Sequence, residues 1–239
     1  MTKPEKLKIK IFADGADLAG ILEMYANPLI RGFTTNPTLM RKAGVADYEA
    51  FAKALLSKVR DRPVSLEVFA DDFSEMGRQA QKIASWGPNV NVKIPITDTK
   101  GASAAPLIER LSKSGVTVNI TAIMTHDQVS AVRRALPPEA PAIVSVFAGR
   151  IADTGVDPVP HMVECLRILA DRPKAELLWA SPRELLNVFQ ADAIGCHIIT
   201  ATNDILKKLE LVGKDLDTYS RETVTMFRRD AVSAGYDIG

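Results

Sequence analysis

The chain has 239 residues, 46% of them hydrophobic and 25% charged, which suits a single large domain. Its 30 Lys and Arg residues nearly balance 29 Asp and Glu residues, so the charge indicates neither a nucleic acid nor an anionic membrane as a partner. No apolar stretch resembles a secretory signal or approaches the roughly 20 residues that span a bilayer, so we expect a cytoplasmic protein.

Short apolar runs rich in β-branched residues alternate with amphipathic stretches along the chain. Strands are predicted at 8–13, 32–35, 64–70, 90–96, 116–121, 142–148, 175–180 and 196–201. Helices are predicted near 17–26, 47–60, 72–86, 102–114, 126–135, 157–170, 184–193 and 203–211. This alternation is typical of a parallel sheet covered by helices, and eight βα units favour a closed (β/α)8 barrel, the TIM barrel, over an open sheet.

Residues 215–237 predict one extra helix after the eighth unit, with apolar residues at helical spacing. This helix could pack on a neighbouring subunit of a homo-oligomer, or it could partly cover the mouth of the barrel. No Gly/Ser linker or low-complexity tract interrupts the sequence, so residues 1–239 are expected to form one domain. The apolar positions are Leu216, Val224, Phe227 and Val232.

Cysteine and histidine usage argues against a disulfide and against a metal. Cys165 and Cys196 lie in segments predicted to be a buried helix face and a buried strand, where they would serve as small apolar residues. The three histidines are widely separated in sequence and none stands at metal-ligand spacing with another. We therefore expect no metal. The sequence also lacks the glycine motifs of nucleotide-binding loops, so it does not indicate a nucleotide cofactor. The histidines are His126, His161 and His197.

Polar residues collect where the predicted strands end, which is where (β/α)8 barrels carry their catalytic side chains. They are Asp14, Thr34, Thr35, Asn36, Glu67, Lys93, Asn119, Thr121, Ser145, Arg150, Ser181 and Arg183, from the first seven predicted strands and the loops that follow them.

Lys93 stands inside the apolar run Val92-Lys93-Ile94-Pro95, where a charged side chain is costly unless it is paired or neutral. A desolvated lysine is a nucleophilic amine that can form a Schiff base with a ketone. A lysine that is ion-paired, for example with Glu67, explains the pattern equally well. Carboxylates and a hydroxyl on other strands, from Asp14, Glu67 and Thr121, could handle the protons of an imine mechanism.

Two arginines on successive late loops suggest an anion site. Arg150 and Arg183, with Ser181 between them, could hold a sugar phosphate through paired hydrogen bonds from their guanidinium groups. Either arginine alone is better explained as a solvated surface residue, whereas for the two together the pattern leaves both interpretations open.

At these residues the sequence resembles the transaldolase and fructose-6-phosphate aldolase family of class I aldolases, over nearly the whole chain. The motifs that carry the resemblance are FADGAD (12–17), GFTTNPTL (32–39), SLEVFA (65–70), VNVKIPIT (90–97), VNITAI (118–123), VFAGRIAD (146–153) and WASPRE (179–184). Each lies at a strand end, which makes the match specific.

The resemblance implies the role of each site residue. Lys93 would form the Schiff base with a dihydroxyacetone unit, and Asp14 would act as acid and base toward the hydroxyl of the bond that is cleaved. Glu67 would work with Thr121 through a water. By the same resemblance Asn36, Asn119 and Ser145 would bind the three-carbon fragment, with Thr35 and Phe147 as further substrate contacts, and Arg150, Ser181 and Arg183 would bind the phosphate.

Two positions favour one branch of the family. At the position of Glu67 the aldolase branch has a Gln, and at the position of Phe147 it has a Tyr. In both residues this chain therefore resembles the transaldolase branch. The implied reaction moves a dihydroxyacetone unit from fructose 6-phosphate or sedoheptulose 7-phosphate to an aldose phosphate, as in the pentose phosphate pathway, without a cofactor. Pro182 and Glu184 depart from the family's phosphate motif, and Glu184 adds negative charge there.

Other functions stay open at this point. One is a direct fructose-6-phosphate aldolase, another is a transaldolase for a different sugar such as a sulfonated one, and a third is a non-catalytic barrel that only binds a sugar phosphate.

Overall fold

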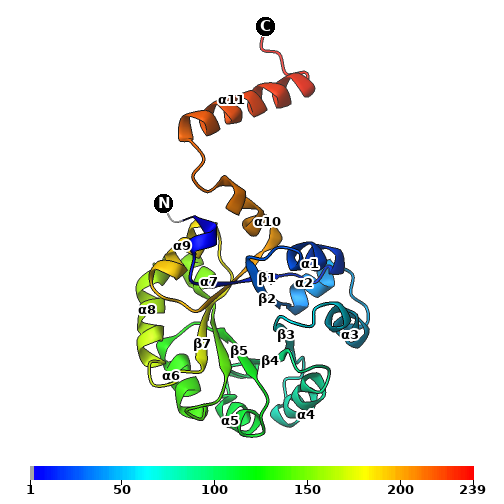
Figure 1. The fold of residues 1–239 in the computed structure, drawn as a ribbon, viewed down its shortest axis with the longest axis vertical. Coiled ribbons are helices and arrows are strands. Elements are labelled where there is room, and N and C mark those ends of the chain that lie inside the picture. Colours follow the sequence, from blue (N-terminus) through cyan, green and yellow to red (C-terminus); the bar gives the residue numbers. More distant parts are fainter. Residues whose placement is uncertain (1–2) are drawn as a thin grey trace.

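The computed structural model describes residues 3–239, and within them eight parallel strands close into a barrel surrounded by helices (Figure 1). Each strand pairs with the next one in the sequence, and β8 pairs with β1. The predicted TIM barrel is therefore confirmed. The strands are β1 (Lys10–Asp14), β2 (Ile30–Thr34), β3 (Val64–Glu67), β4 (Val90–Pro95), β5 (Val118–Ile123), β6 (Ala142–Val146), β7 (Ala175–Trp179) and β8 (Ile198–Thr202).

All eight predicted helices have counterparts. These are α1 (Leu18–Tyr25), α3 (Tyr48–Lys58), α4 (Phe73–Ala84), α5 (Ala105–Lys113), α6 (His126–Ala135), α8 (Pro158–Ile168), α9 (Leu186–Ala193), and α10 (Asn203–Leu206) with the 3-10 helix η2 (Lys207–Leu211). Among residues 3–239, the short helices α2 (Pro37–Lys42) and α7 (Ala148–Asp153) and the 3-10 turn η1 (Pro4–Lys6) were not predicted. None of the helices in this part of the chain has the length and apolar character needed to cross a membrane.

Local sequence explains where most helices begin. A side-chain oxygen at the N-cap accepts a backbone N–H of the first turn in α1, α2, α3, α4, α6, α8 and α11. At α6 the arrangement is a full capping box, because Gln128 also accepts the N–H of Thr125. The predicted third strand ends early at Glu67, since the N–H groups of Phe69 and Ala70 turn to the side chain of Gln79.

An apolar cluster fills the middle of the barrel. Phe12 stands two residues before Asp14 in β1, and Ile143 stands two residues before Ser145 in β6. Because side chains two residues apart in a strand share a face, Phe12 and Ile143 lie on the inner face of the barrel. Gly32 makes room for this cluster, because a Cβ at that position would lie 2.5 Å from the ring of Phe12. The cluster comprises Phe12, Ile143, Leu178, Ala180 and Ile198, with Phe147 packed against it.

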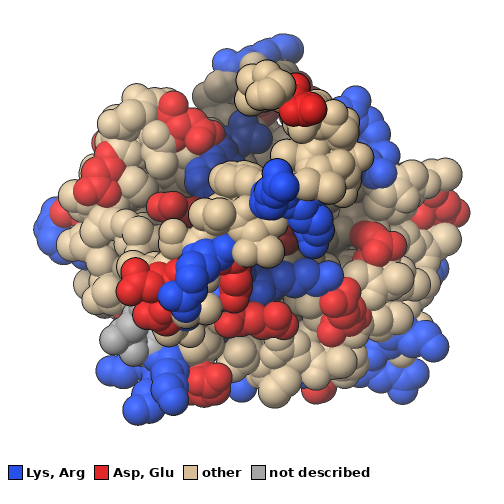
Figure 2. Space-filling view, turned by 90° about the horizontal axis from the view of Figure 1, so that it is seen from above, with Lys and Arg blue, Asp and Glu red and all other residues tan. Residues whose placement is uncertain are grey.

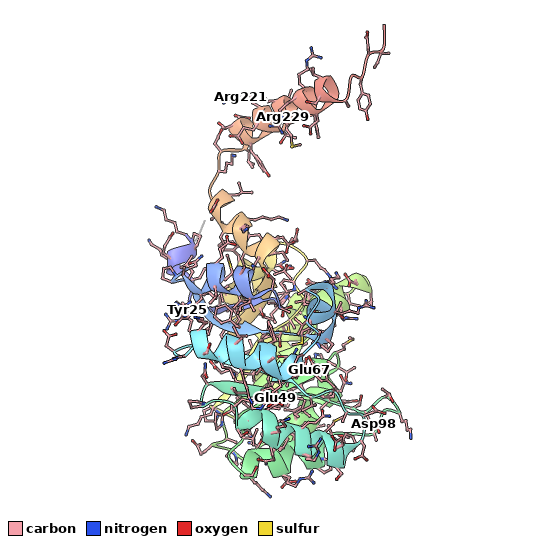
Figure 3. The ribbon with its side chains drawn as sticks, turned by 90° about the vertical axis from the view of Figure 1, so that its right-hand side faces the viewer. Tyr25, Glu49, Glu67, Asp98, Arg221 and Arg229 are labelled. Atoms are coloured by element: carbon pink, nitrogen blue, oxygen red, sulfur yellow. The ribbon has the colours of Figure 1, made fainter. Side chains whose placement is uncertain are left out.

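The last helix, α11 (Leu216–Ser233), projects away from the barrel (Figures 1 and 3). The predicted helix is confirmed, but in the single chain it does not cover the barrel mouth, and none of its residues is buried. Leu216 is 79% exposed and Phe227 is 63% exposed. Both cysteines behave as expected, since Cys165 and Cys196 are buried free thiols and burial raises the pKa of each to about 12.

The face seen in Figure 2 carries Lys and Arg side chains interspersed with Asp and Glu side chains. This mixture agrees with the near-zero net charge of the chain. Among the residues that the structure describes, no broad basic surface is present on this face.

Candidate active site

A cavity of about 390 Å³ opens where the strands end, and all eight strands or the loops after them contribute to its wall. Ten of the twelve residues to which the family resemblance gives a role line it, whereas Thr35 and Arg183 do not. The ten are Asp14, Asn36, Glu67, Lys93, Asn119, Thr121, Ser145, Phe147, Arg150 and Ser181.

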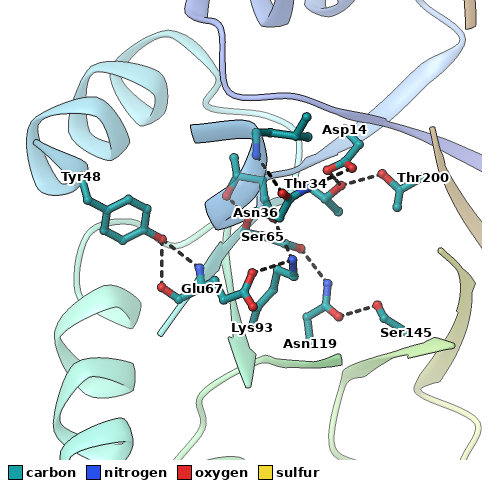
Figure 4. Close-up of polar contacts among 12 residues, drawn as sticks. Asp14, Thr34, Asn36, Tyr48, Ser65, Glu67, Lys93, Asn119, Ser145 and Thr200 are labelled. Atoms are coloured by element: carbon teal, nitrogen blue, oxygen red, sulfur yellow. Dashed lines mark hydrogen bonds and ion pairs between the residues drawn. The ribbon is translucent and has the colours of Figure 1, made fainter. Parts of the chain in front are cut away.

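Lys93 lies in the wall of this cavity with only 7% of its surface exposed. Its Nζ donates to Oε2 of Glu67 at 2.9 Å and to the backbone carbonyl of Thr35 at 2.8 Å (Figure 4). The expected pairing with Glu67 is thus observed, and Thr35 contributes through its backbone. An ammonium held by two acceptors still has one N–H to offer, and a proton acceptor stands beside the amine.

Tyr48, the first residue of α3, holds the backbone of Glu67. Its hydroxyl accepts the N–H of Glu67 at 2.8 Å and donates to the carbonyl of Glu67 at 3.1 Å (Figure 4). Burial raises the pKa of Tyr48, which keeps the phenol protonated and able to donate. Tyr48 was not predicted, because a hydroxyl that hydrogen-bonds only backbone groups leaves no motif in the sequence.

Asp14 stands across the cavity within a small network of hydroxyl and amide groups. Its carboxylate accepts the hydroxyl of Thr34 at 2.8 Å and the amide of Asn36 at 3.3 Å, and the hydroxyls of Thr34 and Thr200 lie 2.6 Å apart. Burial raises the pKa of Asp14, against the opposing charge of Lys93 and the hydrogen bond from Thr34. A carboxyl group disposed in this way can both accept and return a proton. Thr200 was missed, and Thr34 was noted only as a strand end.

A buried chain of hydrogen bonds orients the amide of Asn119. Ser145 donates to Asn119 Oδ1 at 2.6 Å, and Asn119 Nδ2 donates to the hydroxyl of Ser65 at 3.0 Å (Figure 4). These contacts fix which side of the amide carries the donors. Ser65 was not predicted, since it lies within the strand rather than at its end.

Backbone irregularities also gather at the cavity. The pairing of β5 with β6 shifts register between Ile120 and Ile123, and Ala122 adopts a positive φ of 61°. As a result Thr121 and Ala122, although adjacent, both line the cavity. Ser181, also in the wall, has a φ of 58°. Non-glycine residues in this region cost energy, and such strain is common at functional sites.

The predicted anion clamp is only half assembled. Arg150 lines the cavity with its guanidinium 5.6 Å from the ring centre of Phe147, and Ser181 lies in the same wall. Gly149 permits this approach, because a Cβ there would lie 1.5 Å from the carbonyl oxygen of Ser181. Arg183 instead forms a two-point ion pair with Asp153, with Nε 2.9 Å from Oδ1.

Two of the histidines meet in space although they are far apart in sequence. The rings of His126 and His161 stack with centres 4.0 Å apart and planes 20° apart, and Cys165 lies beside them on α8. This cluster is separate from the cavity. Because the nitrogen lone pairs lie in the planes of the two nearly parallel rings, they do not converge on one ion. We therefore still expect no metal.

Comparisons with known proteins identify related sequences over most of the chain. The model of the family described as Transaldolase/Fructose-6-phosphate aldolase matches residues 11–237. A probable transaldolase from Dehalococcoides mccartyi is 34% identical over 202 residues, covering 84% of this chain and 90% of the relative. Another from Chelativorans sp. is 33% identical over 216 residues, covering 88% and 94%, respectively.

Solved structures share the fold at low sequence identity. A 2,3-dimethylmalate lyase of the PEP mutase/isocitrate lyase superfamily superposes with a TM-score of 0.58 at 15% identity, covering 98% of this chain and 87% of that one. A putative lyase/mutase from Burkholderia cenocepacia superposes with a TM-score of 0.58 at 14% identity, covering 97% of this chain and 84% of that one. At this level of identity the similarity concerns the barrel alone.

Proposed function

The chain belongs to the transaldolase/fructose-6-phosphate aldolase family, and within it we propose that the protein is a transaldolase that forms a Schiff base at Lys93. The observation that carries the proposal is the buried amine of Lys93 in the cavity wall, 2.9 Å from Glu67 and in the same cavity as Asp14. Fructose 6-phosphate or sedoheptulose 7-phosphate would be the donor, and an aldose phosphate the acceptor.

In the proposed reaction the neutral amine of Lys93 attacks the ketone of the donor. Glu67, which accepts a hydrogen bond from the ammonium at 2.9 Å, would take a proton from it. With Thr121 it would then supply the proton with which the carbinolamine loses water to give the imine. Asp14 then removes the proton of the hydroxyl on the far side of the bond to be cleaved. The bonding electrons pass to the cationic imine, an enamine remains on Lys93, and an aldehyde departs.

Transfer requires the enamine to survive until an acceptor aldehyde arrives. Phe147 lies in the cavity wall and packs against the apolar cluster of the barrel, so its ring has no proton to give to the enamine. Attack on the acceptor carbonyl re-forms a carbon–carbon bond, and Asp14 returns its proton to the new hydroxyl. Hydrolysis of the imine then frees Lys93.

In the proposed function, two groups of the cavity would bind the phosphate of the sugar. Arg150, on α7, and Ser181, in the loop after β7, supply a guanidinium and a hydroxyl from segments that Gly149 allows to approach closely. Asn36, Asn119 and Ser145 would hydrogen-bond the hydroxyls of the three-carbon fragment.

Borohydride reduction in the presence of fructose 6-phosphate, followed by peptide mass spectrometry, tests the proposal. A stable adduct on Lys93 is expected. Product analysis with and without an acceptor aldehyde then separates transfer from direct aldol cleavage. A sulfonated sugar that gives more trapped adduct than fructose 6-phosphate would favour a transaldolase for sulfonated sugars. The absence of any adduct would leave a barrel that only binds sugars.

We propose further that the protein is a cytoplasmic homo-oligomer, in which the exposed apolar side chains of α11 pack on a neighbouring subunit. Val224 and Phe227 lie on that helix with 64% and 63% of their surface exposed. Light scattering of the wild type and of Phe227→Asp measures the assembly. A monomeric wild type would contradict this part of the proposal.

A further inference from the structure

A second cavity, of about 650 Å³, opens at the other end of the barrel, where the strands begin. Within residues 3–239 it shares no lining residue with the active-site cavity. Phe12 and Ile143 of the central apolar cluster form part of its wall, while Leu178 and Ala180 of that cluster line the active site. The cluster therefore separates two independent cavities, each large enough for a small molecule.

The rim of this second cavity, which we call the lower cavity, is rich in cations. Arg31, Arg62, Lys10 and Lys174 line it, against the carboxylates of Asp61 and Glu176. Figure 3 shows Tyr25, which contacts Arg62 and Asp61, and Asp98, in the loop after β4, at opposite ends of the barrel.

Both carboxylates of the rim already have partners. Asp61 accepts the hydroxyl of Tyr25 at 2.6 Å, and Glu176 pairs with Lys10 at 2.7 Å. Arg31 has no hydrogen bond or ion pair within residues 3–239, so its guanidinium is available to a ligand. The rim as a whole keeps a positive excess that attracts an anion.

Asn91 marks a polar point in the wall of the lower cavity. It is only 8% exposed, and among the described residues 3–239 its side-chain amide has no hydrogen-bond partner. An amide in a cavity wall that has no protein partner is free to bind water or a ligand in the cavity. Asn89, two residues earlier, shows the usual arrangement, since its amide donates to the carbonyls of Val59 and Arg62.

From these observations we propose that the lower cavity binds a small phosphorylated polyol. The guanidinium groups of Arg31, in β2, and Arg62, just before the adjacent β3, bind the phosphate at the rim. The amide of Asn91 and the hydroxyl of Thr117 bind hydroxyl groups of the ligand farther in. The site is separate from the Schiff-base chemistry and does not depend on it.

Thermal unfolding and calorimetric titration with inorganic phosphate and with glycerol 3-phosphate test the site. The parent protein for all measurements carries Arg150→Ala, so that phosphate binding at the active site is weakened. In this parent both probes are expected to raise Tm. Asn91→Leu and Arg31→Glu are each expected to weaken binding of glycerol 3-phosphate on the order of tenfold or more, the effect of losing one hydrogen bond to a charged or buried group.

Two matched controls accompany these variants. Arg134→Ala removes a charge from an exposed arginine that lines neither cavity, and it should leave the affinity unchanged. Asn89→Leu should lower Tm without the probes, whereas Asn91→Leu should not, because only Asn89 loses hydrogen bonds. Arg31→Glu lies at an exposed position and keeps the test decisive if Asn91→Leu fails to fold.

The proposal is overturned if neither probe raises Tm in the Arg150→Ala parent. It is overturned equally if the probes bind Asn91→Leu and Arg31→Glu as tightly as the parent. Binding that is lost in both of these variants and retained in Arg134→Ala supports it.

Discussion

Lys93 and Glu67 face each other across the β3–β4 pair, in register at their Cα atoms and joined by a 2.9 Å contact from Nζ to Oε2. Their side chains are only 9% and 16% exposed. Removing one member of such a pair leaves the other as an uncompensated buried charge, which costs more than the pair itself contributes. The pair therefore links the proposed chemistry to the stability of the barrel.

Lys93→Ala and Lys93→Arg should both abolish turnover and borohydride trapping, because a guanidinium is never a neutral amine under working conditions. They should differ in stability. Lys93→Arg keeps a cation beside Glu67, whereas Lys93→Ala should lower the free energy of unfolding by about 3 to 5 kcal/mol. Adding Glu67→Gln to Lys93→Ala should recover part of that loss in urea unfolding. Trapping at a different lysine would refute the assignment.

Tyr48→Phe should leave both backbone groups of Glu67 without their hydrogen bonds. We expect a loss of about 1 to 3 kcal/mol in unfolding free energy and a lower kcat with little change in KM, because the carboxylate of Glu67 is no longer held beside Lys93. Trapping should still occur at Lys93. Tyr25→Phe, which removes an exposed hydroxyl bonded to Asp61, is the control and should leave kcat unchanged. An unaltered kcat in Tyr48→Phe would show that the contact is structural only.

The fold was predictable because strand periodicity and helix caps are local features of the sequence. The short helices α2 and α7 were missed, since six residues are too few to show a helical period. Strand-end positions identified most of the cavity wall, but they could not identify Tyr48 or Thr200, whose roles depend on packing between distant elements. The pairing of Arg183 with a carboxylate 30 residues earlier in the chain is likewise a property of the folded loops.

Asp153→Ala should release Arg183 to face the phosphate site. In the present structure the two side chains form an ion pair about half exposed to solvent, so breaking it should cost less than about 1 kcal/mol of stability. We expect a lower KM for fructose 6-phosphate and no change for unphosphorylated fructose. Arg150→Ala, in contrast, should raise the KM for the phosphorylated sugar, with a loss of binding free energy on the order of 2 to 5 kcal/mol. If Asp153→Ala leaves every KM unchanged, Arg183 takes no part in phosphate binding.

Asp14→Asn should raise Tm near neutral pH while abolishing turnover, because burial raises the pKa of Asp14 and so disfavours its ionised form. A carboxyl whose pKa is higher in the folded than in the unfolded state destabilises the fold above the folded-state pKa. As pH falls from there toward the ordinary value of 3.8, the wild type should gain stability relative to the variant until the difference from this group disappears. Thermal unfolding of the wild type and of Asp14→Asn across this pH range measures the difference in stability. A stability difference that does not change with pH would contradict the raised pKa of Asp14.

Phe147 and Glu67 together are expected to decide between transfer and simple cleavage. Phe147 packs against the apolar cluster, with Arg150 above its ring, so a tyrosine at this position can keep the same packing and add a hydroxyl in the cavity. That hydroxyl can protonate the enamine on Lys93 and allow hydrolysis before an acceptor binds. Phe147→Tyr should therefore increase release of dihydroxyacetone from fructose 6-phosphate without acceptor, on the order of tenfold.

Glu67→Gln should increase this effect when combined with Phe147→Tyr, because its neutral amide no longer favours the charged imine, so that this intermediate is hydrolysed sooner. Dihydroxyacetone formation is measured with and without glyceraldehyde 3-phosphate for the wild type, both single variants and the double variant. Phe147→Leu is the matched control, since it removes the ring without adding a proton donor, and it should not increase release. A wild type that releases dihydroxyacetone equally fast without an acceptor is a direct aldolase, and the transaldolase proposal then fails.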